Sequence, residues 1–188
     1  TPVAVQKVGN QIESISWMTA SGFSTAISAF IGQNYGADKW DRIRKGYKKG
    51  LQIVGTIGLF STIVLIFGAN PLFRFFIPDD LEALRIGVRY LRILGVSEIL
   101  MTFEIASRGA FNGIGKTIPP SIVGVVFNAL RIPMALVFSS TFLGLDGIWW
   151  SISISSALKG LVLTIWYIVV LKKVPYMEAR FDASIESE

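Results

Sequence analysis

Long apolar runs separated by short polar or charged segments make up most of the chain. Five of these runs approach or exceed the roughly 20 residues that a helix needs to cross a hydrocarbon layer about 30 Å thick. They cover residues 3–31, 51–67, 84–111, 118–142 and 147–171. The first run is unusually polar, so its helix should face other helices or water rather than lipid. The pattern predicts an all-α, polytopic membrane protein with about five transmembrane helices.

The segments between the runs indicate how the helices are connected. The connections at 112–117 and 143–146 are short, so the last three helices should form an antiparallel series. A cluster of helix-breaking residues at 68–71 closes the second run. We therefore expect a single helical lobe over 1–174, followed by a charged cytoplasmic tail over 175–188.

Composition supports this class and removes others. The chain is 52% hydrophobic and only 16% charged, whereas a soluble domain carries about 25% charged residues. It contains no cysteine and no histidine, so thiolate and imidazole zinc sites are excluded, and we expect no metal site and no organic cofactor. The net charge of +5 does not indicate nucleic acid as a partner, because the basic residues gather in the connections.

The basic residues also predict which side of the membrane each connection faces. The connection at 38–49 is rich in lysine and arginine, Lys116 lies in the third connection, and further basic residues follow the fifth run. The positive-inside rule places these three segments in the cytoplasm. Asp79 and Asp80 then lie outside together with the N-terminus, whereas the C-terminus is cytoplasmic. We expect a multi-pass protein of a cell inner or plasma membrane, with at least one helix preceding Thr1.

Four ionisable residues lie deep inside the predicted spans: Glu98, Glu104, Arg131 and Lys159. A charge near the bilayer centre costs roughly 2.5–3.5 kcal/mol, so such residues usually pair, line a polar cavity, or do both. At 1.5 Å per residue their depths from the outer face are about 15, 24, 16 and 20 Å. Similar depths predict two pairs, Glu98 with Arg131 and Glu104 with Lys159, although depth alone does not fix the partners. The pattern indicates a solute or ion pathway, or pairs that only hold the lobe together.

A proline with polar neighbours interrupts the fourth run. Pro133 cannot donate a hydrogen bond to the carbonyl of Ala129, so the helix should kink there. Arg131 lies beside the freed carbonyl, and Asn128 lies about one turn away. A kink with polar neighbours at mid-membrane is common in transporter sites, but packing alone also explains such a kink.

Several stretches resemble the multidrug and toxic compound extrusion (MATE) transporters. Residues 28–39, with Gly-Gln-x-x-Gly-Ala at 32–37 before basic residues, are similar to a helix end and loop that recur in both lobes of that family. Residues 109–117 resemble the end of the tenth helix, and 128–133 together with 144–150 resemble the last two helices. The similarity covers nearly the whole chain. It implies helices eight to twelve of a twelve-helix fold that has two six-helix lobes.

The resemblance implies export of cationic or amphiphilic compounds, driven by inward flow of sodium ions or protons through alternating access of the two lobes. The implied partners are the lipid bilayer, the N-terminal lobe with the preceding helix, and a small-molecule substrate. Glu98 and Glu104 are candidates for exchanging the coupling cation for substrate, with Arg131 and Lys159 tuning their charge. Many family members carry an acidic residue where this chain has Met101, so the coupling carboxylate cannot be assigned by position alone.

Two other classes of function fit parts of the pattern. A flippase for lipid-linked sugars, from the same larger superfamily, uses cationic cavity residues, which Arg131 and Lys159 would supply. An intramembrane transferase is an enzyme that needs acidic metal-binding motifs or a nucleophile, and the adjacent acidic pair Asp79 and Asp80 falls in an outer connection. The sequence therefore favours a secondary-active exporter without catalytic residues.

Overall fold

The computed structural model describes residues 2–78, 80–141 and 143–185, with side chains for 5–78, 80–141 and 143–173. These residues form helices joined by short connections, which confirms the all-α fold class. The helices are α1 (Pro2–Gly36), α2 (Trp40–Phe67), α3 (Ala69–Phe76), α4 (Leu81–Gly95), α5 (Glu98–Gly113), α6 (Ile118–Ser139) and α7 (Leu145–Ile185).

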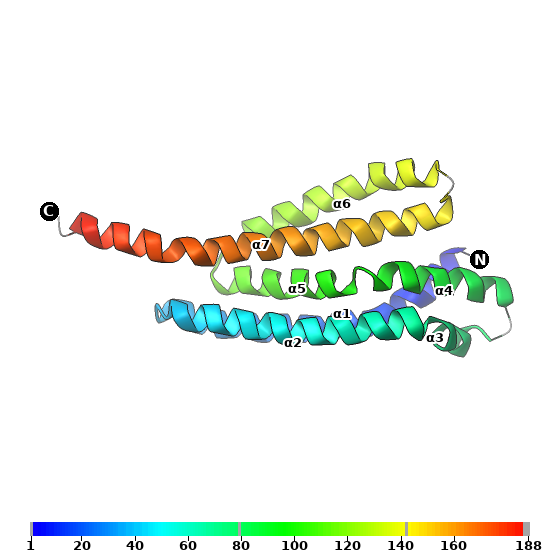
Figure 1. The fold of residues 1–188 in the computed structure, drawn as a ribbon, viewed down its shortest axis with the longest axis horizontal. Helices are drawn as coiled ribbons and strands as arrows, with labels where there is room; N and C mark the ends of the chain where they lie inside the picture. The colour runs from blue at the N-terminus through cyan, green and yellow to red at the C-terminus, as the bar shows by residue number, and fades with distance from the viewer. Residues whose placement is uncertain (1, 79, 142, 186–188) are drawn as a thin grey trace.

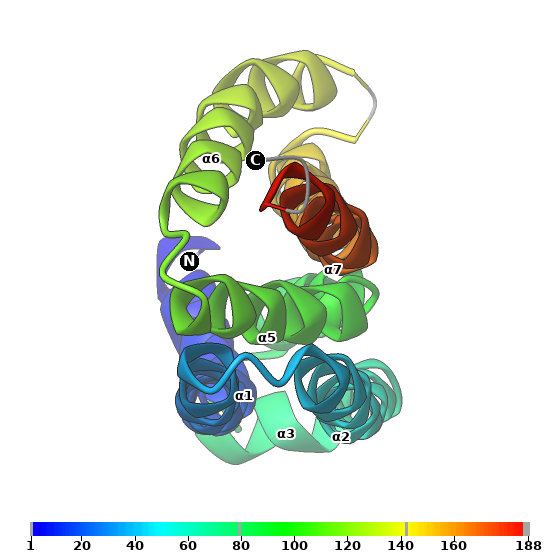
Figure 2. The same ribbon diagram turned by 90° about the vertical axis from the view of Figure 1, so that its left-hand side faces the viewer.

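The helices lie in three layers (Figure 1). One outer layer holds α6 and α7, the middle layer holds α4 and α5, and the other outer layer holds α1, α2 and α3, as the end view in Figure 2 also shows. The α1–α2 and α5–α6 connections lie at the same end as the last turns of α7, whereas α1 begins at the opposite end. The long helices therefore alternate in direction, and α4 and α5 run in line and make one pass between them.

The middle pass, predicted as one helix over 84–111, is broken into α4 and α5. The break leaves backbone carbonyls without helical partners, and in a membrane each of these must find a donor. Two neighbouring helices supply them: Ser153 Oγ donates to the Ile93 carbonyl at 2.9 Å, and Thr62 Oγ1 donates to the Gly95 carbonyl at 3.0 Å. The break is stable because α7 and α2 bring hydroxyl groups to it.

Three further boundaries differ from the sequence prediction. Helix α2 begins at Trp40 rather than at 51. The basic residues at 42–49 lie in a predicted connection, but lysine and arginine are good helix formers. They indicate where the membrane surface lies and not where the helix begins. Helix α3 begins inside the predicted breaker segment at 68–71. Its first turn holds Pro71, a place where a missing backbone N–H costs no hydrogen bond. Helix α7 continues to Ile185, into the segment predicted as a tail. Two residues used in the sequence prediction lie outside the described residues. They are Asp79, from the predicted outer connection, and Phe142, the predicted end of the fourth helix.

Hydropathy agrees with a membrane location for the long helices. Among the described residues, α2, α6 and the part of α7 up to Lys173 are long and apolar enough to cross a bilayer. Helix α1 is more polar, as the sequence predicted, and α4 and α5 are each too short to cross alone. Helix α6 packs chiefly on α7, and Val123 is its one buried residue within the described part of the chain.

Two apolar cores lie toward the two ends of the lobe. The core nearer the α1–α2 connection joins α1, α2, α5 and α7 around Tyr47, Phe111 and Tyr167. The core nearer α3 joins α1, α3, α4 and α7 around Phe73, Tyr90 and Trp149. The residues between the two cores are largely polar, so the middle of the lobe is its most polar zone.

Candidate functional site

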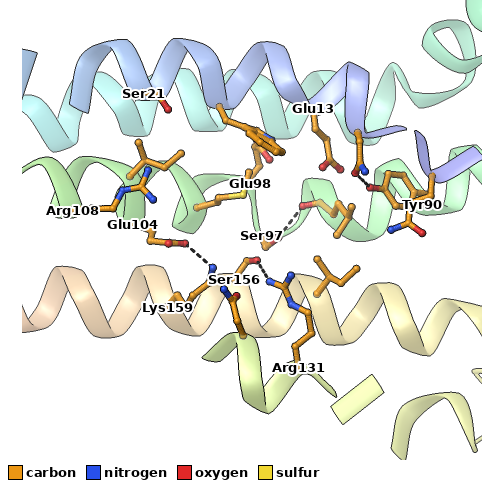
Figure 3. A pocket seen from close by; sticks show the side chains of 18 residues that line it. Glu13, Ser21, Tyr90, Ser97, Glu98, Glu104, Arg108, Arg131, Ser156 and Lys159 are labelled. Atoms are coloured by element: carbon orange, nitrogen blue, oxygen red, sulfur yellow. Dashed lines mark hydrogen bonds and ion pairs between the residues drawn. The ribbon is translucent and has the colours of Figure 1, made fainter. Parts of the chain in front are cut away.

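A cavity of about 560 Å³ occupies this polar zone between the two apolar cores (Figure 3). Side chains from α1, α4, α5, α6 and α7 line it. The four ionisable residues that the sequence placed deep inside the predicted spans all line this cavity. Asn128, the amide side chain near the predicted kink of the fourth run, lines it too. These sequence-predicted residues are Glu98, Glu104, Asn128, Arg131 and Lys159.

Close packing of α5 against α7 positions one charged pair. Gly160 lies so near α5 that a Cβ atom there would overlap the backbone carbonyl of Leu100. This approach brings Lys159 Nζ to 3.4 Å from Glu104 Oε2. The two side chains are only 12% and 14% exposed. The predicted pairing of Glu104 with Lys159 is therefore confirmed.

Arg131 reaches the cavity from α6 but does not pair with Glu98. Its guanidinium donates from Nε to Ser155 Oγ at 3.0 Å and from Nη2 to Ser156 Oγ at 3.3 Å. Both serines lie on α7, on which α6 packs. The predicted depth of Arg131 matches that of Glu98, but Glu98 lies on α5, and α6 hardly touches α5. The partners of Arg131 are therefore neutral hydroxyl groups of α7, the helix on which α6 packs. Pro133 lies inside α6, as the sequence indicated. The kink that it should produce stays a prediction.

Glu98 is the first residue of α5, directly after the helix break. Its carboxylate is 1% exposed, and among the described residues its Oε1 has no hydrogen-bond partner. The N-terminal end of a helix carries a partial positive charge and free N–H groups, which favour a negative group at this place. The break thus places a carboxylate at a helix start in the middle of the lobe.

A second carboxylate, Glu13 of α1, lines the same cavity as Glu98 (Figure 3). Glu13 is 6% exposed, and its Oε1 also lacks a partner within the described part of the chain. Sequence reasoning treated Glu13 only as one of many polar residues of the first helix. The depth argument could have found it, because it lies about 15 Å from the start of that run, the same depth as Glu98.

The wall nearest the α3 end is held by an ordered hydrogen bond. Tyr90 is 1% exposed, and its hydroxyl donates to Asn10 Oδ1 at 2.6 Å. The same ring packs edge-on against Trp149 at 5.2 Å between centroids. This contact ties α1, α4 and α7 together beside the two carboxylates, so the cavity has a firm wall on this side.

The structure defines a polytopic all-α protein with helices long and apolar enough to cross a membrane and a charged cavity in the middle of the lobe, a combination that marks solute or ion pathways. The model of the MatE family matches residues 1–137, which is well over half of the chain. The chain belongs to the MatE family, that is, to the MATE transporters that its sequence resembles.

Individual relatives agree with this assignment. The chain is 31% identical over 152 residues to the probable multidrug resistance protein NorM of Thermotoga maritima, covering 78% of this chain and 32% of that protein. It is 23% identical over 187 residues to the human multidrug and toxin extrusion protein 1, covering 98% of this chain and 32% of that protein. A solved MATE structure in the bent conformation superposes with a TM-score of 0.86 at 22% identity, covering 94% of this chain and 39% of that one.

The chain spans about a third of the length of these curated relatives, at 32% of each. The structural likeness establishes the fold, namely a set of helices of the kind that forms part of a MATE transporter. The relatives named above are a probable multidrug resistance protein and a multidrug and toxin extrusion protein.

Proposed function

We propose that this chain forms part of a secondary-active exporter, in which inward flow of sodium ions or protons drives outward movement of cationic or amphiphilic small molecules. The observation that carries the proposal is the pair of buried carboxylates, Glu13 and Glu98, which line the cavity in the middle of the lobe and each have one oxygen without a hydrogen-bond partner among the described residues. A buried carboxylate without a partner is unfavourable unless it is neutralised. Binding of a proton or a metal cation supplies that neutralisation.

The geometry gives the two carboxylates a shared task. Two negative groups that face one cavity repel each other when both are charged, and one cation or proton between them removes the repulsion. A cationic substrate that enters the same cavity competes for the same negative charge. Coupling then requires only that inward- and outward-open states differ in how strongly they hold each cation.

The other charged residues support the cavity instead of carrying the ion. Glu104 is already neutralised by Lys159, and Arg131 is held by Ser155 and Ser156. Arg131 keeps its positive charge because its serine partners are neutral, and Arg108 also lines the cavity, so the flippase for lipid-linked sugars stays the alternative. Glu13 and Glu98 leave negative charge available, which favours a cationic substrate.

We place the protein in a cell inner or plasma membrane with the α1–α2 connection in the cytoplasm. That connection and the first turns of α2 carry a dense group of basic residues, and the positive-inside rule then puts α3 at the outer face. The N-terminal end of α1 is outside in this orientation. The remaining lobe of the transporter is expected to close the cavity from the side.

Transport by purified protein in liposomes tests the proposal. The protein, as its gene encodes it, is reconstituted with a fluorescent organic cation inside, and a sodium gradient or a proton gradient is applied in separate experiments. Export that depends on one of these gradients is the expected result. Movement of a lipid-linked sugar, with no movement of the organic cation under either gradient, would favour the flippase instead.

A further inference from the structure

A second, smaller cavity of about 280 Å³ lies between α2 and α7, at the end of the lobe where α1 joins α2. From α2 it is lined by Arg44, Lys48 and Leu51, whose spacing of four and three residues places them on one face of the helix. From α7 it is lined by residues at 168–172. The volume is at the low end for a complete small-molecule site, so it suits one part of a larger ligand.

The cavity changes character with depth. Arg44 and Lys48 lie nearest the start of α2, and Lys172 lies in the corresponding part of α7, so the outer rim is basic. Leu51 and Ile168 lie deeper along the same two helices. Ile168 is 37% exposed and continues into the apolar outer surface of α7. A ligand that fits has a negative end at the membrane surface and an apolar part that points into the bilayer.

Tyr47 gives this cavity an apolar floor. Its hydroxyl points into the core, where it shares a hydrogen bond with Ser107 Oγ at 2.7 Å. Its ring packs against Tyr167 with centroids 4.5 Å apart, and only 2% of the residue is exposed. The polar atom of Tyr47 is thus used inside the lobe, and the ring is the part that lines the cavity.

Arg44 joins α2 to α7 at the edge of the cavity. Its Nε donates to the Leu171 carbonyl on α7 at 3.4 Å, and its Nη1 pairs with Asp41 Oδ1 at 2.9 Å. Asp41 is 85% exposed, so this pair is weak in solvent. With Lys48 and Lys172, the rim keeps an excess of positive charge after Asp41 is counted.

We propose that this cavity binds an anionic phospholipid of the adjoining leaflet. The phosphate lies at the rim among Arg44, Lys48 and Lys172, and the first part of an acyl chain runs over Tyr47 and along Ile168. Basic pockets between transmembrane helices recognise anionic head groups through this combination of charge and apolar wall. The bound lipid fastens α2 to α7, and it is independent of the transport cavity in the middle of the lobe.

Native mass spectrometry of the detergent-purified protein, as its gene encodes it, tests this site with phosphatidylglycerol and phosphatidylcholine as probes. The first phosphatidylglycerol should bind about 25-fold tighter than phosphatidylcholine, since Lys48 and Lys172 each contribute roughly a fivefold gain. The double variant Lys48→Gln/Lys172→Gln should lose at least about tenfold in phosphatidylglycerol affinity. Both positions are exposed, so the fold should tolerate the change, and an unchanged melting temperature without lipid verifies this.

The matched control is Lys45→Gln/Lys49→Gln, which removes the same charge from exposed positions of α2 that do not line the cavity. This control should change the phosphatidylglycerol affinity by less than about threefold, because its side chains do not face the bound phosphate. An equal loss in both double variants overturns the site in favour of general surface attraction. Binding of inorganic phosphate as tight as that of phosphatidylglycerol overturns the role of the acyl chain.

Discussion

Separating Glu104 from Lys159 tests whether the charged cavity is held together by this pair. The two atoms lie 3.4 Å apart with side chains 14% and 12% exposed. At an effective dielectric constant of about 20 their attraction is about 5 kcal/mol, from which the cost of desolvating both groups must be subtracted. Removing one partner leaves a buried charge, so Glu104→Gln and Lys159→Met should each destabilise the protein by roughly 3–5 kcal/mol.

The double variant Glu104→Gln/Lys159→Met should cost far less than the sum of the single variants, because no buried charge remains. We expect a coupling energy of roughly 2–3 kcal/mol. Reversible unfolding in mixed detergent micelles, followed by tryptophan fluorescence, measures all three free energies. Arg108→Gln is the control, since Arg108 lines the same cavity but is exposed. If the losses in unfolding free energy of the two single variants add up to that of the double variant, Glu104 and Lys159 do not stabilise each other, and the predicted coupling is refuted.

Three further predictions concern topology and packing. In this cysteine-free chain, cysteines placed at Asp41 and Asp80 should be labelled from opposite sides of intact cells, and labelling from the same side would contradict the topology. Gly160→Ala should lower the free energy of unfolding by roughly 1–3 kcal/mol, because its Cβ overlaps backbone; Gly124→Ala, with open space around it, should have no such cost. Ser153→Ala should cost roughly 1–2 kcal/mol by leaving a buried carbonyl without its donor, and an unchanged stability would show that the helix break does not need it.

The features that depend on chain length and charge were predictable from the sequence. Run lengths set against the bilayer thickness gave the passes and their alternation. Depth counted at 1.5 Å per residue predicted the pairing of Glu104 with Lys159. The prediction succeeded because α5 and α7, which carry the two residues, pack closely against each other. The same depth argument placed Arg131 in the cavity but gave it the wrong partner, since depth does not say which neighbouring helix lies closest.

The features that depend on contacts between distant segments were not predictable. The break between α4 and α5 lies inside a run that is long enough to form one membrane-spanning helix. It exists because Ser153 and Thr62, far away in the sequence, satisfy the freed carbonyls. Gly95 and Ser97 beside Glu98 were the available local signal. Glu13 was overlooked because its helix contains many polar residues; its depth along the first run was the available signal, and its burial is what the structure adds.

The transport function of Glu13 and Glu98 is the central claim, and gradient-driven efflux tests it most directly. Glu98→Gln and Glu13→Gln are introduced separately into the protein as its gene encodes it, and organic-cation efflux is measured beside the yield of folded protein. Glu82→Gln, an exposed change at the start of α4, is the control. The account predicts that both cavity variants fold normally and lose gradient-driven efflux, while the control exports at the normal rate. Normal efflux by both cavity variants, or a loss of efflux that only follows a loss of folded protein, would contradict it.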